Sequence, residues 1–179
     1  LITISNASAK KTLKQRFIKS FPIVIYNGVK QNKIKNYSSS NILEILHVGY
    51  FDLNKNQILL LKSLLNIVKK NIYNIHITFV GKVVDFNIKN IFDNFLNQHN
   101  LNKYVTVEGF KKTVRPYYYK SDVLICTSFV EGLSLSILEA MSIGLPIIST
   151  DTGGVNEQIV SEENGYIIEN NNPLHLSNK

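Results

Sequence analysis

The groups best suited to chemistry in this sequence are two carboxylates and a glycine loop, all within residues 129–157. Glu131 begins a turn of small residues, and Glu139 follows eight positions later on a predicted helix. A Gly-x-Pro break, a short apolar strand and a polar glycine loop come next. In α/β sheets, a strand, a tight turn and a helix N-terminus bind phosphate groups, because free backbone N–H groups and the helix dipole face the anion. The stretch therefore predicts a site for a phosphorylated ligand.

Other nucleotide and metal motifs are absent from the sequence. No Gly-x-Gly-x-x-Gly follows a predicted strand, which argues against a dinucleotide site, and no Gly-x4-Gly-Lys-Ser/Thr occurs, which excludes a P-loop. No Asp-x-Asp pair is present to bridge a metal ion to a diphosphate. The histidines lack metal-ligand spacing and are predicted to be surface or strand-end residues. They are His47, His76, His99 and His175. We therefore expect no metal site and no cofactor.

Composition and charge narrow the classes of partner. The chain has 179 residues, enough for one domain or one domain with a piece of another. Its net charge of +7 suits anionic ligands or an acidic membrane surface. The lysines are scattered, with no run of five or six basic residues, so we expect no nucleic acid partner. The single cysteine, Cys126, lies in an apolar strand and is predicted to be a buried thiol in a reducing compartment. No apolar run reaches the length of a membrane span and the start does not resemble a signal peptide, so we predict a cytoplasmic location.

Hydrophobic periodicity predicts strands that alternate with helices from residue 42 onward. The predicted strands are 42–48, 75–80, 104–107, 123–126, 147–149 and 166–168. The predicted helices are 58–68, 88–96, 114–119, 135–143 and 155–160. This alternation predicts an α/β fold, with a Rossmann-like parallel sheet, helices on both faces and the ligand at the carboxyl ends of the strands.

The two ends of the chain have weaker patterns. Residues 1–5 and 21–26 are predicted strands, with a helix over 9–17 between them that Ser5 or Ser8 can cap. The polar stretch 30–41 is typical of a linker or an exposed connection. Residues 170–179 are predicted to be a loop without a closing helix, as if the domain were cut short.

The stretch 129–157 resembles the signature of retaining nucleotide-sugar glycosyltransferases with the two-domain GT-B architecture, most closely glycosyltransferase family 4. That signature places a Glu, seven residues and a second Glu in a longer context. Here the context is Glu131-Gly132-Leu133-Ser134-Leu135, then Leu138-Glu139-Ala140-Met141-Ser142-Ile143-Gly144-Leu145-Pro146, then Ser149-Thr150-Asp151-Thr152-Gly153-Gly154-Val155 and Glu157. A bare pair of glutamates at this spacing is a weak signal, whereas the whole context is specific. A second candidate, Glu108-Gly109-Phe110, fails because Pro116 lies eight positions after its glutamate.

The resemblance covers most of the chain and implies a domain organisation. Residues 42–179 resemble the nucleotide-sugar donor-binding domain, which is the C-terminal half of a GT-B fold, truncated at its C-terminus. Residues 1–28 resemble the tail end of the N-terminal acceptor domain, and 29–41 the interdomain linker. The rest of the acceptor domain would then be a missing partner, and we expect the isolated chain not to catalyse, because such sites form by domain closure.

The family pattern also implies roles for individual residues. Glu131 would be the catalytic residue, which orients the sugar or stabilises positive charge at its anomeric carbon. Glu139 would accept hydrogen bonds from the ribose hydroxyls. Backbone N–H groups around Gly132, Leu133 and Ser134 would donate to the diphosphate, and Lys55 would add a point charge. The remaining predicted donor-binding residues are Tyr50, which stands where the family carries an arginine, and Phe110, which is expected near the base.

The expected function is that of a metal-independent retaining hexosyltransferase. The donor would be a UDP-sugar or a GDP-sugar, and the acceptor a glycan or a lipid-linked molecule in the synthesis of a surface polysaccharide such as capsule or lipopolysaccharide. Peripheral contact with the inner face of the membrane stays open. Two alternatives also stay open. One is a catalytically inactive GT-B-like nucleotide-binding or regulatory subunit, which the missing arginine favours. The other is a sugar-nucleotide epimerase of the same architecture, which the glutamate context fits less well.

Overall fold

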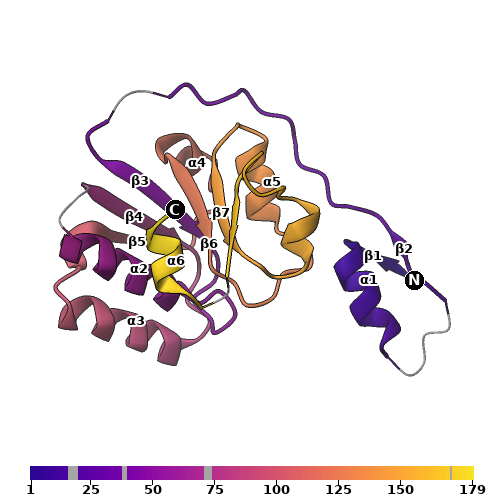
Figure 1. Cartoon of the computed structure of the whole chain (residues 1–179), viewed down its shortest axis with the longest axis horizontal. Coiled ribbons are helices and arrows are strands. Elements are labelled where there is room, and N and C mark those ends of the chain that lie inside the picture. Colours follow the sequence, from indigo (N-terminus) through magenta and orange to yellow (C-terminus); the bar gives the residue numbers. More distant parts are fainter. Residues whose placement is uncertain (16–19, 38–39, 71–73, 170) are drawn as a thin grey trace.

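The main body of the molecule is a six-stranded parallel sheet with the strand order β5-β4-β3-β6-β7-β8 (Figure 1). The computed structural model describes residues 1–15, 20–37, 40–70, 74–169 and 171–179. The strands of this sheet are β3 (Leu43–Val48), β4 (Ile75–Val80), β5 (Val105–Gly109), β6 (Val123–Cys126), β7 (Ile147–Thr150) and β8 (Tyr166–Ile168). The predicted parallel sheet and its strands are confirmed. Strand order reverses between β3 and β6, where Ile45 pairs with Val123, and such a reversal is where open α/β sheets bind ligands.

Helices cover both faces of this sheet, as predicted. They are α2 (Gln57–Lys70), α3 (Phe86–Gln98), α4 (Arg115–Lys120), α5 (Leu135–Met141) and α6 (Pro173–Ser177). Neighbouring residues of β3 point into different cores: Ile45 packs with α2, α3 and α6, whereas Leu46 packs with α4 and α5. Figure 1 shows α2 and α6 in front of the strands. Within the described ranges, no helix is long and apolar enough to cross a membrane.

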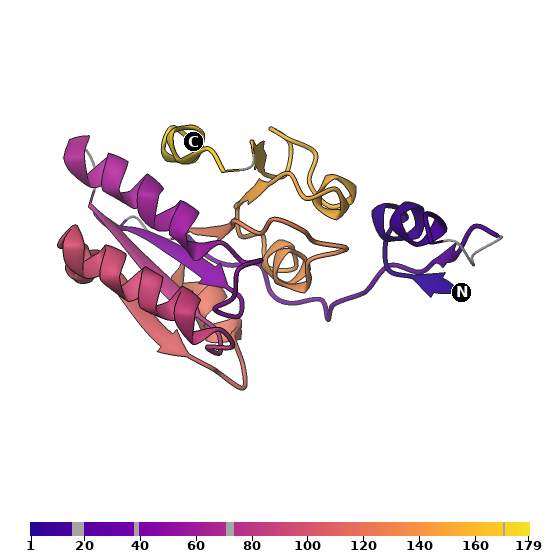
Figure 2. The same cartoon turned by 90° about the horizontal axis from the view of Figure 1, so that it is seen from below.

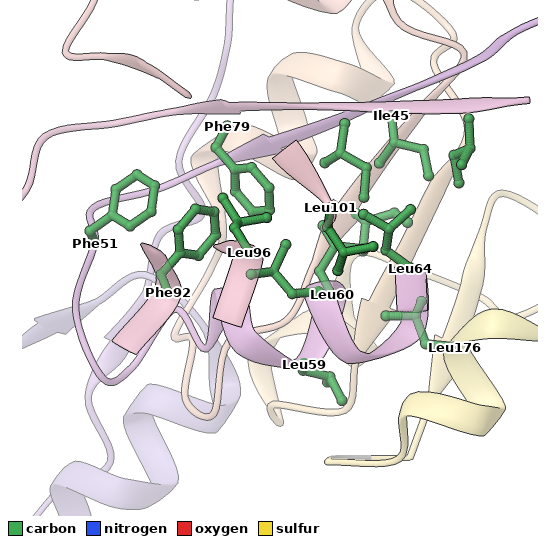
Figure 3. Close-up of a cluster of buried hydrophobic side chains, with 14 of the residues drawn as sticks. Ile45, Phe51, Leu59, Leu60, Leu64, Phe79, Phe92, Leu96, Leu101 and Leu176 are labelled. Atoms are coloured by element: carbon green, nitrogen blue, oxygen red, sulfur yellow. The ribbon is translucent and has the colours of Figure 1, made fainter. Parts of the chain in front are cut away.

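Three phenylalanine rings hold the loop after β3 against the first core. The Phe92 ring meets the Phe51 and Phe79 rings edge-on, with centroids 5.1 Å and 4.9 Å apart (Figure 3). Phe51 is fully buried, although it lies beyond the end of its strand. Edge-to-face aromatic pairs stabilise by about 0.5–1.5 kcal/mol beyond the burial of their surface. The loop that carries Lys55 is therefore fixed to the core at its start.

The described residues before residue 28 form a small unit of their own beside the main sheet (Figures 1 and 2). Here β1 (Ile2–Thr3) pairs in parallel with β2 (Ile23–Val24), and α1 (Asn6–Leu13) lies between them in the chain. The helix begins three residues before the predicted start, because the Ser5 side chain accepts a hydrogen bond from the Ser8 N–H. Residues 16 and 17 of the predicted helix lie outside the described part of the chain.

A carboxylate of the main body holds the start of α1. In the 3-10 helix η2 (Gly154–Glu157), Glu157 accepts hydrogen bonds from the N–H groups of Asn6 at 2.8 Å and Ala7 at 2.7 Å. The Tyr26 hydroxyl donates to the same carboxylate at 2.8 Å. Orphan N–H groups at a helix start favour an anion, so Glu157 acts as a second cap for α1 supplied from elsewhere in the chain.

The predicted linker is extended, as its composition indicates, but part of it is bound to the main body. The Lys35 side chain is almost fully buried, donates to the Ser121 carbonyl oxygen and lies 3.5 Å from Asp122. The Lys35 N–H donates to the Ile143 carbonyl oxygen, and the Tyr37 hydroxyl donates to that of Gly144. This path therefore runs along the main body over residues 35–37.

The prediction that the chain ends without a helix is wrong. Helix α6 begins after Asn172, whose side chain accepts from the His175 N–H, and Pro173 takes the first helical position, where proline is favoured. Leu176 is buried in the first core, and Figure 3 shows it beside Leu64. The Asn-Pro pair that predicts a loop is here a helix-start signal, and the burial of one leucine stabilises the short helix.

Candidate functional site

Lys55 and Glu131 meet at the reversal of strand order. Lys55 lies in the loop after β3 and Glu131 in the loop after β6, and Lys55 Nζ is 2.5 Å from Glu131 Oε1. Their side chains are only 22% and 16% exposed, so the pair is shielded from most of the solvent. A partly buried charge attracts an opposite charge more strongly than an exposed one. The two predicted residues separated by 76 positions in sequence are thus direct neighbours.

The carboxylate of Glu131 is held in one orientation and keeps one oxygen unengaged. Ser128 Oγ donates to Glu131 Oε1 at 2.7 Å, so this oxygen is held by a hydroxyl and an ammonium group together. Among the described residues, no hydrogen-bond donor contacts Oε2. The Glu131 carbonyl oxygen accepts from the Gly154 N–H. A positioned carboxylate with a free oxygen is suited to accept from a hydroxyl or to stabilise positive charge.

A buried histidine supports the backbone of Lys55. Thr127 Oγ1 donates to the Lys55 carbonyl oxygen at 2.7 Å and lies 3.1 Å from His47 Nε2. Burial, together with the nearby Lys55 charge, lowers the pKa of His47 to about 3, so the ring is neutral at physiological pH. From the sequence, His47 was predicted to be a surface or strand-end residue. It does lie near the end of β3, but it is buried. The ring thus contacts Thr127, which in turn holds the Lys55 backbone, and in the described part of the chain no three acidic, histidine or cysteine residues cluster as possible metal ligands.

The turn after Glu131 offers two free backbone donors. In the part of the chain that the structure describes, the N–H groups of Gly132 and Leu133 have no protein acceptor. The Ser134 N–H differs from the expectation, because it donates to the Gln158 side chain at 2.8 Å and is not available to a ligand. Gln158 also donates back to the Ser134 carbonyl oxygen, which fixes the turn. The turn can therefore present two N–H groups to an anion, where three were expected.

A cleft of about 360 Å³ joins most of the predicted residues. Those that line it are Tyr50, Lys55, Phe110, Glu131, Leu133 and Ser134. Gly132 is not among its lining residues, and a Cβ added there would point toward the N-terminal unit, 2.7 Å from Ser8 Oγ. Sequence reasoning missed Lys82 and Lys111, which also line the cleft. The sequence could have indicated both lysines, since each closely follows the carboxyl end of a predicted strand, where the ligand is expected.

Glu139 lies in a neighbouring cavity of about 550 Å³ that shares Val114 and Leu135 with the cleft. Its Oε2 accepts a hydrogen bond from the Tyr118 hydroxyl at 2.8 Å. Burial, and then the Glu139 charge, raises the pKa of Tyr118 above its ordinary value, so the phenol stays protonated and donates. The tyrosine cluster 117–119 was predicted to pack a short helix onto the sheet, and Tyr118 is indeed buried in the second core. The tyrosine cluster in the sequence did not predict the hydrogen bond between Tyr118 and Glu139.

Tyr118→Phe is expected to weaken the binding of a ligand that contacts Glu139 by about three- to tenfold, because a lost hydrogen bond to a charged group costs about 1 kcal/mol or more. The substitution removes only a hydroxyl, so the ring stays packed and the free energy of unfolding should change little beyond this bond. Calorimetric titration with a nucleoside diphosphate, the class of ligand that the sequence predicts, measures the change. The matched control is Tyr119→Phe, whose hydroxyl contacts the Lys33 carbonyl oxygen instead. Equal affinity of Tyr118→Phe and the unaltered protein would show that Glu139 needs no fixed orientation.

A third cavity, also of about 550 Å³, lies on the other face of the sheet. Apolar side chains of α2, α6 and the central strands form most of its wall, including Leu64 and Ile67. None of the predicted site residues lines it. The first cleft brings together Lys55, Glu131 and Leu133, whose N–H group is one of the two free donors, which makes that cleft the candidate site.

Comparisons with known proteins agree on the family and the fold. A sequence model described as glycosyl transferases group 1 matches residues 29–179. The glycosyltransferase MJ1178 of Methanocaldococcus jannaschii is 30% identical over 172 residues, which cover 90% of this chain and 43% of that protein. CapH of Staphylococcus aureus, a capsular polysaccharide biosynthesis glycosyltransferase, is 29% identical over 98% of this chain and 48% of its own length.

The crystal structure of Anabaena Alr3699/HepE in complex with UDP-glucose has the same fold, with a TM-score of 0.89 at 22% identity. The match covers 99% of this chain and 51% of that one. The chain therefore spans about half the length of the relatives it matches. Since the family model covers the whole main sheet and its helices, the chain belongs to the glycosyl transferases of group 1.

Proposed function

We propose that this chain is the donor-binding part of a retaining, metal-independent hexosyltransferase that uses a nucleoside-diphosphate sugar. The observation that carries the proposal is the Lys55–Glu131 pair beside the free N–H groups of Gly132 and Leu133, at the reversal of strand order. This arrangement places a cation and two donors where a diphosphate can bind, and a carboxylate next to them. The relatives named above support a glycosyl donor and a polysaccharide product.

The proposed residue roles combine the family pattern with this geometry. The diphosphate would accept from Gly132 and Leu133 and approach Lys55, whose charge would stabilise the leaving group as the sugar bond breaks. Glu131, with its free oxygen, would orient the sugar or stabilise its anomeric carbon. Glu139 would accept from the ribose hydroxyls in the adjoining cavity, held by Tyr118. The base would lie beside Phe110, which is 69% exposed at the edge of the cleft.

The domain organisation is part of the same proposal. Residues 1–28 would be the tail end of an acceptor domain, 29–41 the linker, and 42–179 the donor domain. Two observations support this: the family match begins at residue 29, and strands β1 and β2 form a separate two-stranded sheet. Each strand of that small sheet exposes an isoleucine, Ile2 and Ile23, as expected for a fragment of a larger sheet. The acceptor, a glycan or a lipid-linked molecule, would be held by the rest of that domain, in the cytoplasm or at the inner face of the membrane.

The test of the proposal is a thermal unfolding panel of this chain with UDP, GDP, UDP-sugars, GDP-sugars and inorganic pyrophosphate. A ligand present at about 100 times its Kd stabilises the folded state by about 2.7 kcal/mol, which raises Tm by about 5 °C or more. We expect one nucleoside diphosphate to give this shift, with and without EDTA, and pyrophosphate to give less. No shift with any nucleotide, or an equal shift with pyrophosphate, would contradict the proposal. A shift that EDTA removes would contradict its metal independence.

A further inference from the structure

The lysines that line the cleft differ in whether a carboxylate already neutralises them. Lys55 is paired with Glu131 at 2.5 Å, and Lys111 is paired with Glu108 at 2.6 Å. Lys82 lines the same cleft, and it takes part in none of the salt bridges between residues of the described ranges. Before any ligand binds, Lys82 is therefore the cleft lysine whose positive charge is uncompensated.

The backbone of Lys82 is fixed at the wall of the cleft. Its carbonyl oxygen accepts from the N–H of the buried Phe51 at 2.9 Å, and the N–H of Gly81 donates to the Gly109 carbonyl oxygen. A Cβ at position 81 would lie 1.8 Å from the Gly49 carbonyl oxygen, so the loops after β3 and β4 are in direct contact there. Lys82 is thus anchored beside Tyr50, a residue that lines the cleft without contributing a charge.

We propose that Lys82 provides the cation for the diphosphate on the β4 side of the cleft, a role that rests on the donor-binding function proposed above. A nucleoside diphosphate carries two to three negative charges, and Lys55 can offer it only a charge shared with Glu131. Lys82 adds a full positive charge without breaking an existing ion pair. It thereby supplies a positive charge on the wall where Tyr50 supplies none, and it favours diphosphate ligands over the uncharged nucleoside.

The experiment is an NMR titration of the whole 179-residue chain with UDP and with uridine. Its variants are Lys82→Gln, Lys82→Arg and the control Lys62→Gln, a lysine exposed on α2. We expect Lys82→Gln to raise the Kd for UDP about five- to tenfold, as for the loss of one charge-assisted hydrogen bond, and to leave the Kd for uridine unchanged. Lys82→Arg should restore the affinity, and Lys62→Gln should match the unaltered chain. Because exposed charges are screened by salt, the difference should shrink at 1 M NaCl.

The outcomes of this titration distinguish failure of the Lys82 inference from failure of the donor-binding function. Unchanged UDP affinity in Lys82→Gln would overturn the inference while the donor-binding function stands. Equal losses for UDP and uridine would also overturn it, because they would indicate a structural role for the side chain. If the unaltered chain binds neither ligand, the proposed function fails and this inference fails with it.

Discussion

In the full-length protein, Glu131→Gln is expected to lower kcat for glycosyl transfer by at least about 100-fold and to leave UDP bound as tightly as before, or more tightly. The loss of rate follows because a preorganised charge at a reacting centre contributes about that much to catalysis. Affinity should not fall, because the substitution removes a negative charge next to the diphosphate and frees Lys55 from its 2.5 Å ion pair. Gln can still accept from Ser128, so the turn keeps its shape.

Steady-state kinetics together with calorimetric UDP titration separates these two effects. Glu44→Gln is the matched control, because the Glu44 carboxylate also contacts a nitrogen-bearing side chain, 3.2 Å from His76 Nδ1, but lies near the amino end of β3. The control should keep kcat within about twofold. A Glu131→Gln enzyme with more than one tenth of the normal kcat would remove Glu131 from the mechanism. If the full-length protein binds UDP but transfers no sugar with either Glu or Gln at position 131, a binding-only role would be favoured.

Gly154→Ala is expected to destabilise the fold by about 2–4 kcal/mol and to impair nucleotide binding as well. A Cβ at this position would lie 1.8 Å from the Gly132 carbonyl oxygen and 2.7 Å from that of Glu131. Both are backbone atoms, so no flexible side chain can move aside, and the turn that carries the site has to shift. The effect therefore reaches the free N–H groups of Gly132 and Leu133.

Urea unfolding of the 179-residue chain measures the change in free energy. Gly28→Ala is the control, because a Cβ there meets no atom within 4 Å. It should be neutral, or stabilise by a few tenths of a kcal/mol by restricting the unfolded chain. If the free energy of unfolding of Gly154→Ala lies within about 0.5 kcal/mol of that of the unaltered chain, the glycine loop accommodates a Cβ and does not fix the turn.

The arrangement of the main sheet could be predicted because its signals are local. Each strand is a short apolar run, and each long helix repeats apolar residues at helical spacing, so alternation alone specifies a parallel sheet. That Lys55 and Glu131 act on one ligand was implied by the family resemblance, and the structure places them together in the loops that follow the adjacent strands β3 and β6. The sequence around Glu131 and Glu139 then indicated that this edge of the sheet binds a nucleotide sugar.

The remaining features depend on contacts between distant segments, which a single sequence does not show. Gln158 occupies the Ser134 N–H, and Glu157 caps α1 from more than 140 residues away. In the sequence, Lys35 is one lysine of a polar linker, whereas in the structure its side chain contacts Ser121 and Asp122. Each of these is a polar group that finds a partner only after the chain has folded.

Backbone amide NMR with stepwise addition of UDP tests whether the cleft beside Glu131 binds the diphosphate. We expect the largest chemical-shift changes at Gly132 and Leu133, whose N–H groups are free in the described structure, with further changes at Gly49 and Lys82. Amides of α2 that line the apolar cavity, such as that of Leu64, should not change. Changes centred on that apolar cavity, or saturation by UDP with no change at Gly132 and Leu133, would show that the diphosphate does not bind beside Glu131.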